Sequence, residues 1–230
     1  MKGTVIQVGV GDWAGRGFFI KVRGERYVIT AAHCVGRLPI ADSGEFMEDH
    51  TYKNFLGPLN GPRNIWAACL FVDPIADIAV FCEPNEIVFS SESKAYREFA
   101  KQATPFVLSR MRVPGLFKAT SDAQILSFDG EWFSCRIDCY HNLLIWIADA
   151  GQQILRGMVG SPIILPDGSV VGAVSIKDGP HAMLSGRLPV WLVREARWKT
   201  WDSEEGYPLA ASVESIIAIR DAGHLLRRRQ

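Results

Sequence analysis

The stretch GRGFFIKVRGERYVITAAHCVG, residues 15–36, carries most of the information about the fold. Two β-rich runs, GFFIKV and RYVIT, flank a Gly-Glu turn and predict an antiparallel hairpin. The second run leads directly into Thr30-Ala31-Ala32-His33-Cys34, which places a histidine just after a strand. A single histidine in such a place is usually structural, so its meaning depends on the rest of the chain.

Two later segments bear on His33. PIADIAVFCE, which begins at Pro74, places Asp77 directly before an Ile-Ala-Val strand. RGMVGSPIILPDGSVVGAVSI, residues 156–176, contains a loop, a short strand, a Pro-Asp-Gly turn and a second strand. The chain therefore offers a histidine, an aspartate and a Gly-Ser-Pro loop, in that order.

Short β-rich runs alternate with turn signals as far as about residue 195. A charged segment divides them into two sets of about six, which predicts an all-β fold of two antiparallel six-stranded β-barrels. The expected single domain, 1–230, has a first barrel (1–90), a linker (91–103), a second barrel (104–210) and a C-terminal α-helix (211–230). The polar stretch 39–63, rich in Gly and Pro, is expected to be a long surface loop.

Three segments together resemble the histidine, aspartate and nucleophile segments of the bacterial-type trypsin-like serine proteases. They are ITAAHC, PIADIAV and GMVGSPIIL, and with their neighbouring strands they span roughly residues 15–176. The resemblance implies a double-barrel fold in which His33 is the general base and Asp77 orients its imidazole. Asp73 matches less well, because no Ile-Ala-Val run follows it.

The same resemblance implies further site residues. The backbone N–H groups of Gly157 and Val159 would form the oxyanion hole, and Ser175 would hydrogen-bond Asp77. The substrate-binding residues would be Gln153 at the base of the specificity pocket, and Val174, Ser175 and Ile176 in an edge strand that pairs with an extended peptide.

The sequence departs from this family at the nucleophile, because Val159 occupies the serine position. An isopropyl group neither attacks a carbonyl nor gives a proton to His33, and loss of the serine costs a serine protease about 10⁶ in turnover. The chain is therefore predicted to be an inactive pseudoprotease that binds a peptide or protein partner in the groove or within a larger assembly. Two alternatives stay open: an active serine endopeptidase whose natural serine at this position was replaced, and direct activation of water by His33 and Asp77.

Other nucleophiles and ligands are less well placed. Ser161 lies two residues beyond Val159, and that offset on a tight loop should turn its hydroxyl away from His33. Cys34 adjoins His33 and is interpreted as a core thiol. Cys135, Cys139 and His141 in CRIDCYH lack an evident fourth ligand for zinc. No metal and no cofactor is predicted.

Composition limits the partners. The 230 residues contain 25 basic and 25 acidic side chains, and this zero net charge argues against a nucleic-acid partner. No apolar run is long enough to cross a membrane. The odd number of cysteines, scattered in apolar runs, indicates free thiols and predicts a cytoplasmic location.

Overall fold

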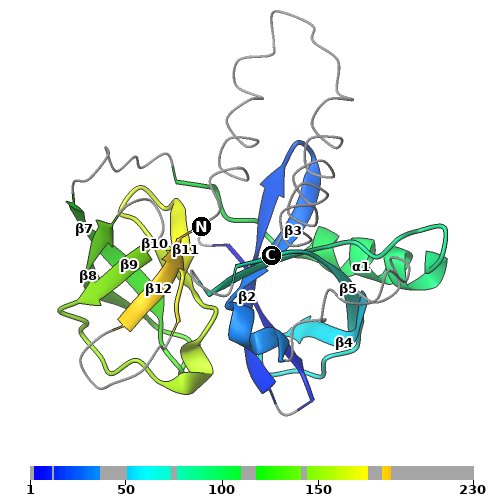
Figure 1. The fold of residues 1–230 in the computed structure, drawn as a ribbon, viewed down its shortest axis with the longest axis horizontal. Coiled ribbons are helices and arrows are strands. Elements are labelled where there is room, and N and C mark those ends of the chain that lie inside the picture. Colours follow the sequence, from blue (N-terminus) through cyan, green and yellow to red (C-terminus); the bar gives the residue numbers. More distant parts are fainter. Residues whose placement is uncertain are drawn as a thin grey trace, which may run out of the picture. The chain divides into compact units, whose positions relative to one another are not determined.

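In the part of the chain that the structure describes, the fold consists of two β-barrels and one helix of several turns (Figure 1). The computed structural model describes residues 3–11, 13–36, 51–73, 77–109, 118–140, 144–175 and 183–187. The elements in chain order are β1 (Val5–Val10), β2 (Trp13–Val22), β3 (Glu25–Thr30), η1 (Ala32–Val35), β4 (Thr51–Pro58), β5 (Ile65–Asp73), β6 (Ile78–Cys82), α1 (Ser90–Gln102), β7 (Lys118–Leu126), β8 (Trp132–Tyr140), β9 (Leu144–Ala148), η3 (Arg156–Met158), β10 (Pro162–Ile164), β11 (Val170–Ala173) and β12 (Met183–Arg187).

The first barrel is closed and antiparallel, in the order β1-β2-β3-β6-β5-β4. Its seam is the pairing of β1 with β4, which runs from Ile6↔Pro58 to Val8↔Leu56. The β2–β3 hairpin forms as the sequence predicts, with Val22 opposite Glu25 at the turn. Because each of the six strands is hydrogen-bonded to two neighbours, this barrel has no free sheet edge.

Successive side chains of β2, β3 and β6 point alternately into two different apolar layers. Phe19, Val28 and Phe81 are cross-strand neighbours and point into the barrel interior. Their neighbours along each strand point to the opposite face, because side chains alternate across a strand. These are Phe18, Ile29 and Val80, which pack with Leu126, Ile164 and Val170 of the second barrel. The long apolar runs of the sequence reflect this burial on both faces.

The second barrel follows the order β10-β11-β12-β9-β8-β7 and closes along only part of its length. Its longest pairing joins β7 with β8, whereas β10 meets β7 at just two positions, Ile163↔Ile125 and Ile164↔Gln124. The pairing of β11 with β12 is equally short. The prediction of a mainly β fold with a closed first barrel is therefore confirmed. The second barrel is less complete than predicted.

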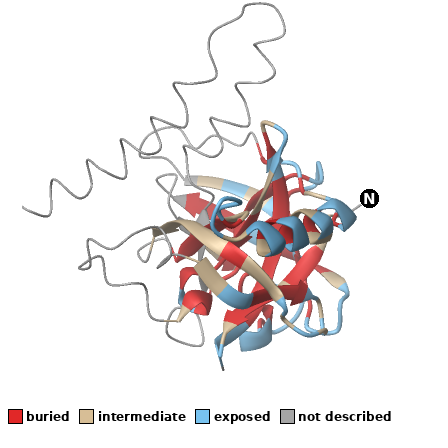
Figure 2. Cartoon of the chain, turned by 90° about the vertical axis from the view of Figure 1, so that its right-hand side faces the viewer, coloured by how far each residue is buried: buried red, intermediate tan, exposed pale blue. Residues whose placement is uncertain are grey.

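Helix α1 covers most of the segment expected to be a linker. Ser93, Tyr96 and Ala100 form its buried face, at the spacing of a helix that packs on one side. The Tyr96 hydroxyl donates to the Arg26 carbonyl at 3.0 Å and so ties α1 to the first barrel. Figure 2 shows the pale blue outward face of α1 over the red buried strands. Within the described ranges, no helix has the length and apolarity needed to cross a membrane.

Some of the expected elements differ from the structure or lie outside the described residues. The expected surface loop at 39–63 is partly wrong, because β4 occupies Thr51–Pro58 and closes the first barrel. Between α1 and β7, residues 104–109 form only isolated bridges, from Phe106 to Ile20 and from Leu108 to Val170. The predicted C-terminal helix, 211–230, and the end of the predicted second barrel lie outside the described residues.

Candidate active site

His33 and Asp77 meet because the strands that carry them pair. β3 ends at Thr30, which lies opposite Ala79 near the start of β6. In an antiparallel pair, the residues after β3 therefore lie beside those before β6. His33 sits in the short helix η1, and Asp77 directly precedes β6 with a φ of 53°. Aspartate is one of the few residues that adopts this left-handed conformation readily.

Three hydrogen bonds hold the Asp77 carboxylate in place. His33 Nδ1 lies 2.7 Å from Asp77 Oδ2, and the backbone N–H of His33 donates to Oδ1 at 3.0 Å. The hydroxyl of Ser175, which follows β11 in the second barrel, donates to Oδ2. Asp77 is only 3% exposed, whereas the His33 side chain is 41% exposed. The structure thus brings His33, Asp77 and Ser175 together at the junction of the two barrels.

Burial and hydrogen bonding have opposite effects on the Asp77 carboxyl. Burial raises the pKa of Asp77, because the charged form loses hydration. The hydrogen bonds from His33 and Ser175, together with the charge of His33, outweigh burial and lower the pKa of Asp77 below its ordinary value. The carboxylate therefore stays ionised at neutral pH and can fix the orientation of the imidazole.

Val159 follows the short helix η3 and is part of the first barrel's core. It is 3% exposed and packs in the same cluster as Ala31, Cys34 and Val35. Its carbonyl accepts the Arg16 backbone N–H at 2.7 Å, which fixes the loop against β2. The nucleophile position thus carries a buried isopropyl group, with no hydroxyl for His33 to activate.

The predicted oxyanion donors are not both directed outward. The Val159 N–H donates to the Arg156 carbonyl at 3.1 Å within η3. Gly157 lies between them, on the exposed side of this turn. For Gly157 and Val159 to bind an oxyanion together, the Val159 N–H must first leave the Arg156 carbonyl. The role of these two donors stays a prediction.

The predicted substrate-binding residues lie in different environments. Gln153 is exposed in the loop between β9 and η3. Val174 is fully buried, and its backbone exchanges hydrogen bonds of 2.8 Å with Gly160 and Ser161. Its backbone groups therefore serve the loop, and a peptide strand would have to pair beyond Val174. Ile176 lies outside the described residues.

The alternative nucleophiles and ligands are in the interior. Ser161 is 0% exposed, and its Oγ lies 3.4 Å from the Arg16 guanidinium. All the cysteines lie in described segments and are free thiols. Burial raises the pKa of Cys34 to about 12, so it carries little thiolate at neutral pH. Cys135 and Cys139 pack in the core of the second barrel.

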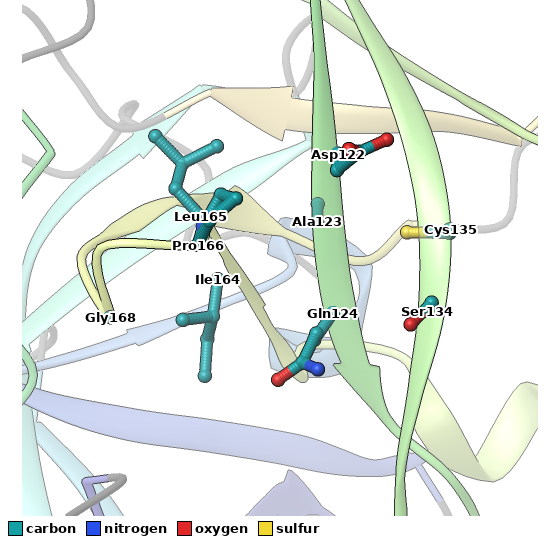
Figure 3. A pocket seen from close by; sticks show the side chains of 9 residues that line it. All are labelled: Asp122, Ala123, Gln124, Ser134, Cys135, Ile164, Leu165, Pro166 and Gly168. Carbon is teal, nitrogen blue, oxygen red and sulfur yellow. The ribbon is translucent and has the colours of Figure 1, made fainter.

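A separate groove lies on the second barrel, between β7 and the turn that follows β10 (Figure 3). Its volume is about 570 Å³, and its lining residues include Asp122, Gln124, Ser134 and Pro166. None of the predicted site residues lines this groove. It opens where β7 extends beyond its short pairing with β10.

The chain is similar in structure to several proteases. Similarity to the inactive form of the Rv3671c protease of M. tuberculosis covers 85% of this chain and 88% of that one, at 17% identity and a TM-score of 0.49. The NSP4 proteinase of Equine Arteritis Virus matches over 81% and 77%, at 15% identity and a TM-score of 0.48. The Yersinia pestis serine endoprotease matches over 85% and 61%, at 15% identity and a TM-score of 0.47. No protein-family model and no curated protein matches the sequence.

Two residues beside the site had no place in the sequence analysis. Arg16 is 3% exposed and donates to three carbonyls, one at the end of β7 and two in the β7–β8 turn. The ring of Phe128 from that turn lies so close to Gly157 that an added Cβ there would be 2.7 Å from Cε2. The only signal in the sequence was a charged residue between two glycines at the start of a buried run, GRGFFI.

The Asp77 carboxylate should make stability depend on pH in the acid range. Asp77→Asn is expected to lower the free energy of unfolding at pH 7 by about 2 kcal/mol, because hydrogen bonds to a charged acceptor are lost. A carboxyl whose pKa is lowered by folding stabilises the fold above its ordinary pKa of about 4, and this stabilisation disappears as pH falls through the folded-state value. Urea unfolding of both proteins between neutral and strongly acidic pH should show their curves converging at low pH.

The matched control for this titration is Asp129→Asn, an exposed carboxyl in the β7–β8 turn. Its curve should run parallel to that of the unaltered protein, since an exposed side chain rarely changes stability by more than about 0.5 kcal/mol. A constant gap between Asp77→Asn and the unaltered protein at every pH would contradict the assigned cause.

Proposed function

We propose that this chain is a trypsin-like pseudoprotease that binds an extended segment of a peptide or protein partner beside His33 and does not cleave it. One observation carries the proposal: the hydrogen-bonded set of His33, Asp77 and Ser175 is complete, while position 159 holds a valine buried in the core. A base without a nucleophile favours binding over cleavage at this site.

The packing of Val159 supports a natural valine. Its side chain fills space beside Ala31 and Cys34, and a well-packed core position tolerates changes in volume poorly. The free thiols, three of them buried, fit a protein of a reducing compartment, and we place it in the cytoplasm on that ground. The zero net charge supports a protein partner rather than a nucleic acid.

A second function, an active serine endopeptidase with serine at position 159 in nature, is favoured by the intact link from His33 to Asp77. Sequencing the source gene separates the two, because a serine codon at that position is decisive for the endopeptidase.

Binding is tested by panning a phage-displayed library of linear peptides against the unaltered protein. We expect enrichment of peptides whose affinity falls about tenfold, or ~1.4 kcal/mol, in Gln153→Trp, because the bulky ring would obstruct the proposed binding surface at this exposed residue. Lys94→Trp is the control, since Lys94 is exposed on α1. Equal affinity for all three proteins would place the ligand elsewhere.

The same peptides serve to test inactivity. After prolonged incubation with the unaltered protein they should remain intact by mass spectrometry. Cleavage that is lost in His33→Ala would contradict the proposal and support activation of water by His33 and Asp77.

A further inference from the structure

Arg16 is a buried cation whose partners are neutral. Its guanidinium donates to the carbonyls of Leu126 (3.0 Å), Ser127 (2.7 Å) and Phe128 (3.0 Å), and one nitrogen lies 3.4 Å from Ser161 Oγ. Within the described ranges these are its side-chain acceptors, and no carboxylate is among them. Burying a charge is unfavourable unless hydrogen bonds replace its hydration. The hydrogen bonds that replace the hydration of Arg16 therefore tie it to the segments that supply its acceptors.

The backbone of Arg16 holds the loop that contains the nucleophile position. Its N–H donates to the Val159 carbonyl at 2.7 Å, and its own carbonyl accepts the Thr30 hydroxyl at 2.8 Å. Gly160, with a φ of 79°, lies so close to this carbonyl that a Cβ there would overlap it. β2 and the loop therefore have a fixed separation at Arg16.

The side chain of Arg16 joins this loop to a second segment, the β7–β8 turn. Ser161 belongs to the loop, while Ser127 and Phe128 belong to the turn. The two segments also meet where the Phe128 ring lies over Gly157. A planar guanidinium has five donors in a rigid fork, so one residue can fix several acceptors in one geometry. Backbone and side chain together hold the loop from two directions.

We propose that Arg16 is a positioning residue of the candidate site: it holds the loop 156–161 and the β7–β8 turn at fixed positions relative to His33. The functional part of this inference rests on the proposed function, since the position of the loop affects function only if the site binds or reacts. The geometric part concerns the loop alone and has its own test. Arg16 contacts no ligand in this role and acts through the backbone of Val159 and Gly157.

The geometric part is tested by amide hydrogen exchange in Arg16→Lys, which keeps the charge and loses the fork. The reporters are Ser127, whose N–H donates to Glu131, and Ser161, whose N–H donates to Met158. Both amides should exchange at least about tenfold faster than in the unaltered protein, while the paired amides of β3 and β6 are unchanged. An increase at Ser127 alone, or an equal increase throughout the protein, would overturn the proposal, because a merely structural arginine produces the latter.

The functional part is tested with a fluorophosphonate probe in the Val159→Ser background. At a temperature where circular dichroism shows every variant folded, Arg16→Met should lower the labelling rate about a hundredfold, the effect of a displacement of about 1 Å in a reacting group. The labelling rate of Arg16→Lys should lie between that of Arg16→Met and that of the Val159→Ser background. Arg63→Met is the matched control, since that partly exposed arginine also donates to two carbonyls, of Gly11 and Trp13, but both belong to the first barrel.

The two tests fail in different ways. If Val159→Ser is not labelled at all, the functional part of this proposal is refuted, while hydrogen exchange still decides the position of Arg16 and peptide panning still decides the proposed binding. If Val159→Ser is labelled and Arg16→Met reacts at the same rate, the positioning role is refuted and the cleft stands. Equal losses in Arg16→Met and Arg63→Met would also overturn the proposal, since the effect would then not depend on the link between the two segments.

Discussion

Gly160→Ala is expected to destabilise the protein by more than about 4 kcal/mol, enough to prevent folding of many domains of this size. Two causes add at this position. The φ of 79° costs a residue with a Cβ about 1–2 kcal/mol. The Cβ would also overlap the backbone carbonyl oxygen of Arg16 and lie 2.8 Å from Thr30 Oγ1. One face of β2 packs in the core of the first barrel and the other packs against the second barrel, so the strand has little freedom to move away.

Gly168→Ala is the matched control for this substitution. Gly168 has a φ of 82° in the turn before β11, and no atom lies within 4 Å of an added Cβ. An alanine at this position has the same backbone strain without the overlap, so the free energy of unfolding should fall by only about 1–2 kcal/mol. Equilibrium urea unfolding measures both, or expression in soluble form where Gly160→Ala does not fold. Similar losses in the two variants would mean that β2 yields and that the loop is not fixed there.

The parts of the fold that the sequence predicts are those set by local patterns. The β2–β3 hairpin, the strand after Asp77 and the Pro166–Gly168 turn each follow from alternation or turn residues within a few positions. His33 and Asp77 were paired through a resemblance, and the register of β3 on β6 supplies the physical reason. β4 was missed because its exposed Lys53 and Asn54, the latter with a φ of 50°, interrupt the alternation.

The features that were not predicted depend on the orientation of single peptide groups, on contacts between distant segments, or on the exact length of a strand. The hydrogen bond from the Val159 N–H to the Arg156 carbonyl is a choice of peptide orientation, which side-chain patterns do not encode. Arg16 is 110 or more residues away from its carbonyl acceptors, and an arginine near a strand end ordinarily predicts exposure. The partial closure of the second barrel likewise follows from the length of β10, a strand of three residues.

Val159→Ser is expected to convert an unreactive protein into one that a fluorophosphonate labels at position 159, at a rate at least about 10³ above that of the unaltered chain. The hydrogen bond between His33 Nδ1 and Asp77 is already formed, and the half-exposed imidazole is accessible. The substitution therefore adds only the missing nucleophile. The variant should nevertheless react more slowly than a full serine protease, because the Val159 N–H must leave the Arg156 carbonyl before it can stabilise an oxyanion.

Val159→Ala separates the hydroxyl from the loss of volume. Both substitutions leave a cavity beside Ala31 and Cys34, so both should destabilise the first barrel by a comparable amount, about 1–2 kcal/mol. Only serine brings a nucleophile, and its reactivity should vanish when His33→Ala is added. Labelling of Val159→Ala, or of the unaltered chain, would show that another hydroxyl reacts, and Ser161 would be the first to examine by peptide mapping. Labelling confined to the serine variant would mean that the valine side chain alone silences a site whose base and orienting carboxylate are in place.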